Sequence, residues 1–126
     1  LIAAHDCAEF NITLNSISST WNNNKMDDMV NKLYANKFVY MGGDGIIQNK
    51  KALIAHFKDG FKSGSSLTFK ILHCQYFSND YGSMILQYTL KDGAKISQGY
   101  DQLVVHTTHG KQRIVSDFPR AIQAND

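Results

Sequence analysis

The chain has 126 residues, of which 43% are apolar, and this is enough for one domain with one continuous core. The chain has 13 Lys and Arg residues and 11 Asp and Glu residues, which gives a formal charge of +2. This is not the cationic excess that nucleic-acid binding requires. Apolar runs such as 103–105 are far shorter than the roughly 20 residues of a membrane span, so neither nucleic acid nor a membrane is expected as a partner.

Helical periodicity dominates the first half of the chain. A stripe of apolar residues at steps of four, three and four predicts a helix over residues 8–21: Phe10, Leu14, Ile17 and Trp21. After a polar asparagine run the spacing resumes and predicts a second helix over 25–35. A glycine-rich turn between two β-prone runs predicts a small hairpin over 37–48, and a third stripe predicts a helix over 50–62.

Beyond Ser66 the apolar period changes to two, which predicts four long strands over about 66–78, 83–91, 95–108 and 111–119. Their short connections require antiparallel neighbours. Helices followed by such a meander indicate an α+β domain over residues 1–126, with three helices on one face of an antiparallel sheet. Apolar residues also occur on the outer face, and we expect a homodimer to form through it.

The two cysteines, Cys7 and Cys74, are too few for a disulfide framework and lack the spacing of a zinc site. Periodicity does not decide whether they meet, since a disulfide needs α-carbons within roughly 7 Å. The compartment is also open. A cytoplasmic protein is favoured, and secretion is the alternative because residues 1–4 match the small-residue end of a signal peptide.

Three phrases resemble the SnoaL-like branch of the nuclear-transport-factor-2-like superfamily, over nearly the whole chain. They are the step from helix to strand at 33–40, the opening of the third helix at 49–57 and the last strand at 109–118. The resemblance implies a cone-shaped, cystatin-like roll in which the sheet is highly curved and the helices cover its concave side. Members of this superfamily include isomerases, dehydratases, cyclases and transport adaptors, so fold alone does not name a reaction.

The ketosteroid isomerases of this superfamily use a carboxylate base after the first strand, and a tyrosine and a protonated acid as an oxyanion hole. The matching positions here are Gly42, Ser18 and Gly99, and Asp44 is two residues away from the first. The resemblance therefore does not extend to the isomerase constellation.

Strand alternation, together with the resemblance, predicts which strand residues face the cone. Gly99, Asp101, Leu103 and Val105 share one face of their strand, and Arg113, Val115 and Asp117 share one face of the next. Asp101 and Asp117 are then expected close to opposite each other, where mutual repulsion would raise one pKa and leave an acid beside a base. The alternative is that one Asp faces outward, or that Arg113 or a backbone amide neutralises it.

The expected lining of the cone is largely aromatic, and the same residues could instead be plain core. It comprises Trp21, Tyr34, Tyr40, Phe57, Tyr76, Gln87, Tyr88, Gly99 and Leu103. The resemblance matches Tyr34 and Phe57 to lining positions of the family, and Gln87 is expected to need a hydrogen-bond partner there. His56, at the edge of the third stripe, is interpreted as a solvated or capping histidine. Metal-binding histidine spacing is absent, and no metal or cofactor is expected.

Two hypotheses for function remain. The first is a protein that binds a small, mostly apolar molecule in the cone, or a cofactor-independent isomerase, dehydratase or cyclase that uses Asp101 or Asp117 for proton transfer. The second is a non-catalytic interaction module whose cone is filled by its own side chains and whose outer sheet face binds a partner.

Overall fold

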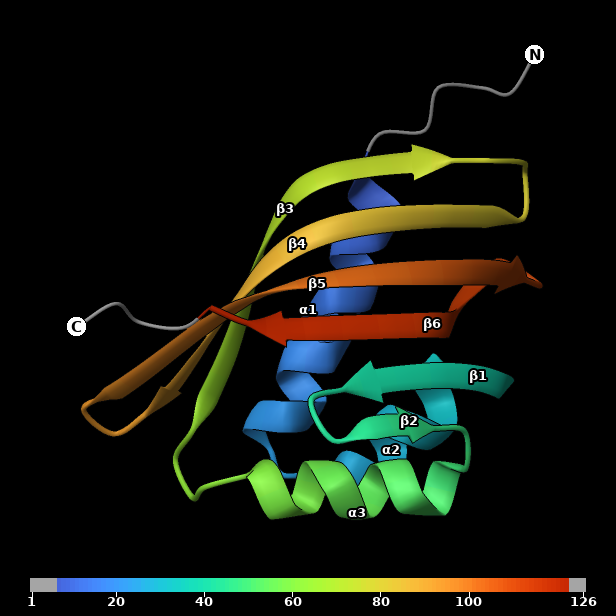
Figure 1. Ribbon diagram of the computed structural model, residues 1–126. Helices are drawn as coiled ribbons and strands as arrows, with labels where there is room; N and C mark the ends of the chain where they lie inside the picture. The colour runs from blue at the N-terminus through green and yellow to red at the C-terminus, as the bar shows by residue number, and fades with distance from the viewer. Residues whose placement is uncertain (1–6, 123–126) are drawn as a thin grey trace.

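The computed structural model describes residues 7–122, so the start of the chain at residues 1–4 lies outside the described part (Figure 1). The helices are α1 (Ala8–Asn22), α2 (Met26–Leu33) and α3 (Lys50–Gly60). The strands are β1 (Tyr34–Gly42), β2 (Gly45–Ile47), β3 (Ser66–Tyr76), β4 (Tyr81–Asp92), β5 (Lys95–Thr108) and β6 (Lys111–Ala121). Within this part, no helix combines the length and the hydropathy needed to cross a membrane.

The six strands form one sheet in the order β2-β1-β6-β5-β4-β3. Four of the five pairings are antiparallel, but β1 runs parallel to β6, so the sheet is mixed and the expectation of a wholly antiparallel sheet is wrong at this pair. The physical reason is that β1 and β6 are distant in the chain, and no short turn dictates their direction. The α+β class with three helices on a curved sheet is confirmed.

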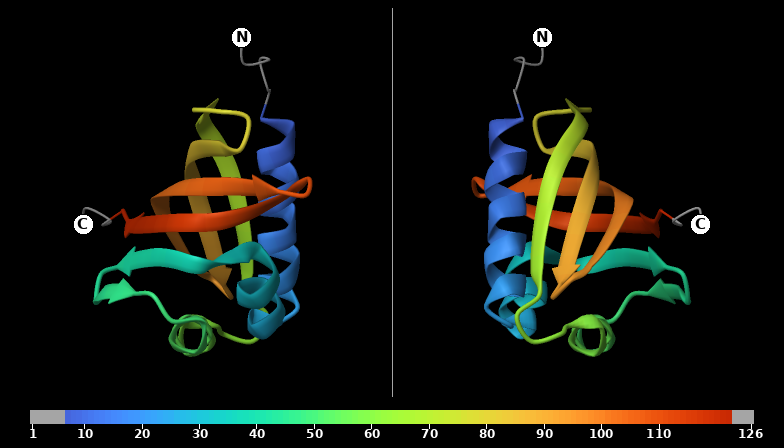
Figure 2. Two further views of the ribbon diagram at one scale, coloured as in Figure 1. Left: turned by 90° about the vertical axis from the view of Figure 1, so that its right-hand side faces the viewer. Right: turned by 90° about the vertical axis from the view of Figure 1, so that its left-hand side faces the viewer.

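Curvature gives the molecule its cone shape. Strands β3, β4 and β5 bend along their length, and α1 crosses the concave face of the sheet (Figures 1 and 2). Helix α3 lies beside the short hairpin of β1 and β2. The apolar stripe of α1 is buried, since the exposed fractions of Phe10, Leu14, Ile17 and Trp21 are 0%, 3%, 8% and 6%. Helix α3 begins at a side-chain cap, where Asn49 accepts a hydrogen bond of 3.0 Å from the Ala52 amide.

A β-bulge in β6 decides which of its residues enter the cone. Val104 pairs with Ser116 and the next residue, Val105, pairs with Ile114, so Val115 is the extra residue. Ile114 on one side of the bulge and Asp117 on the other are therefore both buried. Strict alternation predicted Arg113 and Val115 inward with Asp117. That prediction is wrong for Arg113 and Val115 because one inserted residue reverses the alternation.

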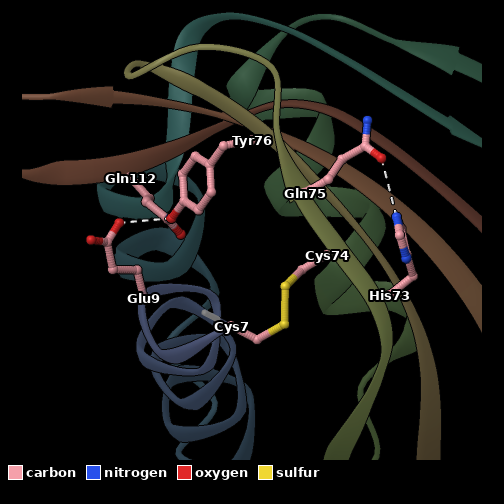
Figure 3. Close-up of a disulfide and its surroundings, with 7 residues drawn as sticks. All are labelled: Cys7, Glu9, His73, Cys74, Gln75, Tyr76 and Gln112. Atoms are coloured by element: carbon pink, nitrogen blue, oxygen red, sulfur yellow. Dashed lines mark hydrogen bonds between the residues drawn. A yellow bond between two sulfur atoms is a disulfide. The ribbon is translucent and has the colours of Figure 1, made fainter. Parts of the chain in front are cut away.

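The narrow end of the cone is closed by a disulfide and a polar network, shown in Figure 3. Cys7 and Cys74 are bonded, with their α-carbons 6.1 Å apart and 67 positions apart in the chain. Cys7 occupies the N-cap of α1, which has no side-chain cap, so the bond ties this helix end to β3.

The polar network beside the disulfide joins three elements. Thr13 on α1 donates to Gln112 of β6 over 2.6 Å, and Gln112 donates to the Tyr76 hydroxyl of β3 over 3.1 Å. The Tyr76 hydroxyl donates in turn to Glu9 over 2.7 Å. Tyr76 was expected to line the cavity, but its hydroxyl instead takes part in closing the opposite end of the cone.

The disulfide should carry a large share of the stability. Replacing both cysteines by serine opens a long loop and raises the conformational entropy of the unfolded chain. The free energy of unfolding should therefore fall by about 2–4 kcal/mol. Urea titration followed by tryptophan fluorescence measures the loss.

Reductant should lower the urea concentration at the unfolding midpoint of the wild type and leave that of the double variant unchanged. Equal midpoints for the two proteins without reductant would contradict a stabilising bond. Disulfides persist in oxidising compartments, so we expect the full stability only where the chain matures in one.

Candidate functional site

The cone contains a cavity of about 470 Å³. Its walls are mostly apolar and are drawn from all three helices and from five of the strands and their turns. The aromatic lining residues are Trp21, Tyr34, Tyr40, Phe57, Phe69 and Tyr88, and the aliphatic ones include Ile17, Met29, Leu67, Leu90, Leu103 and Pro119. Polar lining comes from Asp44, His56, Asp59, Asp101 and Asp117. Asp44 and Asp59 are exposed, and they mark the opening at the β1–β2 turn and the end of α3.

Most of the residues expected in the lining meet at this cavity, but Gln87 does not. Its neighbours Leu86 and Tyr88 turn inward, so alternation along β4 places Gln87 on the outer face, beside Tyr100 in the ladder. The expectation of an inner amide in need of a partner is therefore wrong.

Gly99 also differs from its expected place as a lining residue. It is buried and faces the Tyr88 ring, and a β-carbon at Gly99 would lie 2.3 Å from that ring. The absence of a side chain at Gly99 thus gives Tyr88 the space in which it lies against the cavity wall.

The two candidate carboxyl groups come together across β5 and β6. Asp117 pairs with Leu103 and Asp101 pairs with Pro119, so the two aspartates are diagonal neighbours on one face. Each of the two side chains is among the causes of the other's pKa shift, so the two groups interact. The Tyr34 hydroxyl donates to Oδ2 of Asp117 over 2.5 Å, and Asp117 is only 4% exposed.

The pair needs a proton. The Oδ1 atoms of Asp101 and Asp117 are both buried and receive no hydrogen bond from any group within residues 7–122. Two ionised carboxylates can only accept hydrogen bonds, and their charges repel each other. A proton held between the two carboxyl groups removes the repulsion and supplies one of the missing donors.

The environment assigns the proton to Asp101. Burial, followed by the negative charge of Asp117 and the hydrogen bond between the two groups, raises the pKa of Asp101 to about 11. Burial also raises the pKa of Asp117, but hydrogen bonds from Asp101 and Tyr34 oppose that rise. The donor from Tyr34 favours the charged form of Asp117, so the arrangement favours an acid at Asp101 beside a base at Asp117.

Three tyrosines around the pair stay protonated. Burial first, and then the charge of the aspartates, raises the pKa values of Tyr34, Tyr40 and Tyr88. The Tyr40 hydroxyl lies 3.2 Å from Nε2 of His56, and the two rings are 5.2 Å apart between centroids. His56 thus contacts Tyr40 and lines the cavity, which the interpretation as a solvated or capping residue missed. Its place one residue before the stripe member Phe57 was the only signal.

The described part of the chain contains no cluster of three or more His, Cys, Asp or Glu side chains that could hold a metal ion.

The acid of the pair predicts an unusual pH dependence of stability. An acid with a higher pKa in the folded chain contributes stability that is full below its unfolded pKa, about 4, and that falls as the pH rises toward the folded value. Asp101→Asn keeps a donor for Asp117 without a titrating proton. The free energy of unfolding of the variant minus that of the wild type should therefore increase as the pH rises, by at most about 1.4 kcal/mol per pH unit.

Urea titrations at several pH values between weakly acidic and weakly alkaline solution measure this difference. Asp80→Asn, in the exposed turn between β3 and β4, serves as the control and should follow the wild type. Parallel losses of stability in wild type and Asp101→Asn would disprove the shared proton.

Gly99→Ala should disturb the cavity wall. The new methyl group collides with the Tyr88 ring, so the ring must move and the free energy of unfolding should fall by about 1–3 kcal/mol. Gly43→Ala is the matched control because a β-carbon there meets no atom within 4 Å, and its effect should stay within about 0.5 kcal/mol. Thermal denaturation of both variants tests this, and equal melting temperatures would show that Tyr88 does not depend on the glycine.

No protein-family model and no curated protein sequence matches this chain. Solved structures are similar to it across most of its length. An NTF-2-like protein of unknown function from Shewanella oneidensis has a TM-score of 0.77 at 16% identity, over 88% of this chain and 95% of that one.

Two further structures carry names of enzymes. A putative scytalone dehydratase from Novosphingobium aromaticivorans has a TM-score of 0.74 at 11% identity, over 91% of this chain and 83% of that one. A ketosteroid isomerase-like protein from Erwinia carotovora atroseptica has a TM-score of 0.74 at 14% identity, over 93% of this chain and 96% of that one. At such identities the likeness concerns the fold and not the reaction. The chain therefore has the nuclear-transport-factor-2-like fold.

Proposed function

We propose that this protein binds a small, mostly apolar molecule in the cone and transfers a proton on it without a cofactor. The observation that carries the proposal is that Asp101 and Asp117, diagonal neighbours on one face of the sheet, both line a cavity of about 470 Å³. A cavity of this size is within the usual range for small-molecule sites, and a few polar groups in an apolar lining are typical of them.

The chemistry follows from the different states of the two carboxyl groups. Asp117 as carboxylate removes a proton from carbon or hydroxyl, while Asp101 as acid donates its proton to the oxygen on which negative charge develops. The pair has then gained one proton and lost one, and the reverse transfers restore it. Isomerisation, dehydration and cyclisation each have steps of this type.

Neighbours support the reaction class only by analogy. The names of two of them mention a scytalone dehydratase and a ketosteroid isomerase, and both reactions move protons on oxygenated carbon skeletons. The positions that matched the isomerase constellation hold Gly42, Ser18 and Gly99 here. The acid and base we propose thus lie at other places in the same cone.

A second candidate function is association through the outer sheet face. Ile85, Tyr100 and Phe118 expose 40%, 47% and 39% of their surface there. Ladder register makes them neighbours, because Ile85 pairs with Gln102 and Gln102 pairs with Phe118, while Tyr100 lies two residues from Gln102 on the same face. We propose a second copy of this chain as the partner, since a self-complementary apolar patch suits a symmetric dimer.

Native mass spectrometry of protein from its source organism, followed by analysis of the released small molecules, tests both candidates. We expect a dimer that retains one reproducible apolar compound per cavity. Leu90→Trp fills the cavity and should lose the compound, whereas Lys91→Trp, exposed at the next position, should retain it. A dimer without a compound, and no binding to a metabolite panel, would leave only the interaction module.

If the retained compound is turned over, Asp117→Asn should reduce the rate by about 100-fold to 10,000-fold, the range for loss of a general base. Unchanged turnover in both Asp117→Asn and Asp101→Asn would refute the proposed chemistry while leaving the binding site intact.

A further inference from the structure

The charge of the cavity lining is one-sided. Four carboxyl groups line it, from Asp44, Asp59, Asp101 and Asp117, and among the described lining residues there is no Lys or Arg. His56 is the only basic side chain in that lining. Clefts lined by one sign of charge attract ligands of the other sign and repel those of their own. The lining therefore disfavours carboxylates and phosphates as ligands and favours cations.

Two buried carboxyl oxygens beside the cavity lack donors. The Oδ1 atoms of both Asp101 and Asp117 are buried without a hydrogen bond from the described chain, and both residues line the cavity. The proton shared between the two carboxyl groups supplies at most one donor, and buried acceptors without partners are costly. Both atoms are covered in the free protein, so a carboxyl group must turn toward the cavity to meet a ligand, and a ligand group then stabilises the pair by donating hydrogen bonds, not by accepting them.

An ammonium group meets both requirements. It offers three donors and no acceptor when it terminates a primary amine. It also compensates the negative charge of the carboxylate, which is otherwise expensive to bury in apolar surroundings. A hydroxyl group offers one donor and no charge, so it satisfies the pair less completely.

The walls suit the rest of such a ligand. The Phe57 ring packs edge-on to Tyr40, with centroids 5.5 Å apart, and lies 6.3 Å from Trp21 and 6.2 Å from Tyr34. Ring faces attract cations, and aromatic surface buries an apolar body. The volume of about 470 Å³ accommodates a body of one or two fused rings.

We propose that the cavity takes an organic amine in its ammonium form, with an aryl or alicyclic body against the aromatic walls and the nitrogen between the carboxyl groups of Asp101 and Asp117. This inference rests on the binding part of the proposed function, since it names the ligand class of that same site; with an amine bound, the ammonium and not Asp101 is the acid beside the Asp117 carboxylate. It separates the binding of amines from the binding of neutral oxygenated compounds.

Binding is then linked to proton release. In the free protein one proton is held between the two carboxyl groups. The ammonium replaces it as the donor, so Asp101 loses its proton to the solvent and both groups become carboxylates paired with the cation. The other titratable groups that face the pair are the hydroxyls of Tyr34, Tyr40 and Tyr88 and the imidazole of His56, while Asp44 and Asp59 lie at the opening.

Three probes with one apolar body test the inference: naphthylethylamine, naphthylethanol and naphthylacetate. Isothermal titration calorimetry at neutral pH should show the amine binding at least about tenfold more tightly than the alcohol, and no binding of the acetate. Repeating the amine titration in buffers of different ionisation enthalpy should show release of up to one proton per amine bound. Alcohol binding should show none.

The double variant Asp101→Asn/Asp117→Asn should reduce the affinity for the amine to that for the alcohol, retain alcohol binding and abolish proton release. Asp80→Asn, an exposed control distant from the cavity lining, should leave all three unchanged.

Alcohol binding as tight as amine binding, or amine binding without proton release, would overturn the amine and leave the apolar pocket in place. Preferential binding of the acetate would overturn the argument from charge. If none of the three probes binds, the ligand pocket itself is refuted and the amine with it.

Discussion

Two carboxyl groups share one mostly apolar cavity, and the rest of the site depends on this constraint because burial and repulsion both oppose the second negative charge. The surroundings supply part of what the pair needs: the Tyr34 hydroxyl donates to Asp117, and the backbone at Gln102 and Phe118 opposes the rise in the pKa of Asp101. In the proposed site, a ligand that donates hydrogen bonds supplies the donors that the pair still lacks. A cavity that satisfied both groups fully would be only a core.

The position of the pair depends on one irregularity of the sheet. Without the extra residue at Val115, a buried Ile114 and an inward Asp117 could not occur in the same strand. The parallel pairing of β1 with β6 also matters, since Tyr40 is the register partner of Asp117 and Tyr34 begins the same strand. The bulge and the mixed sheet thus bring one acid, one base and two tyrosine hydroxyls to one wall.

One end of the cone is cross-linked and the cavity opens at the other end. At the narrow end the Cys7–Cys74 bond and the chain of hydrogen bonds through Gln112 and Tyr76 join α1 to β3 and β6. At the wide end the lining residues Asp44 and Asp59 are exposed. A closed, cross-linked end holds the curvature of the sheet, so the other end can leave space between sheet and helices without collapse.

Local patterns in the sequence determined the elements of this protein. The stripe from Phe10 to Trp21, the switch of period after Ser66 and the short strand connections depend on neighbouring residues, so they predicted three helices and a meander. Alternation placed Asp101 on one face with Leu103, and the family resemblance predicted that this face is the inner one. The inward position of Asp117 was also predicted, although the residues named beside it on β6 were wrong.

Long-range pairing decided what local patterns could not. The bulge at Val115, the direction of β1, the outward turn of Gln87 and the contact of His56 with Tyr40 each depend on how distant segments align. The meeting of Cys7 with Cys74 is of the same kind. The physical reason is that side-chain direction in a strand reverses with every residue, so a single inserted or shifted position, which only the tertiary structure selects, exchanges the two faces.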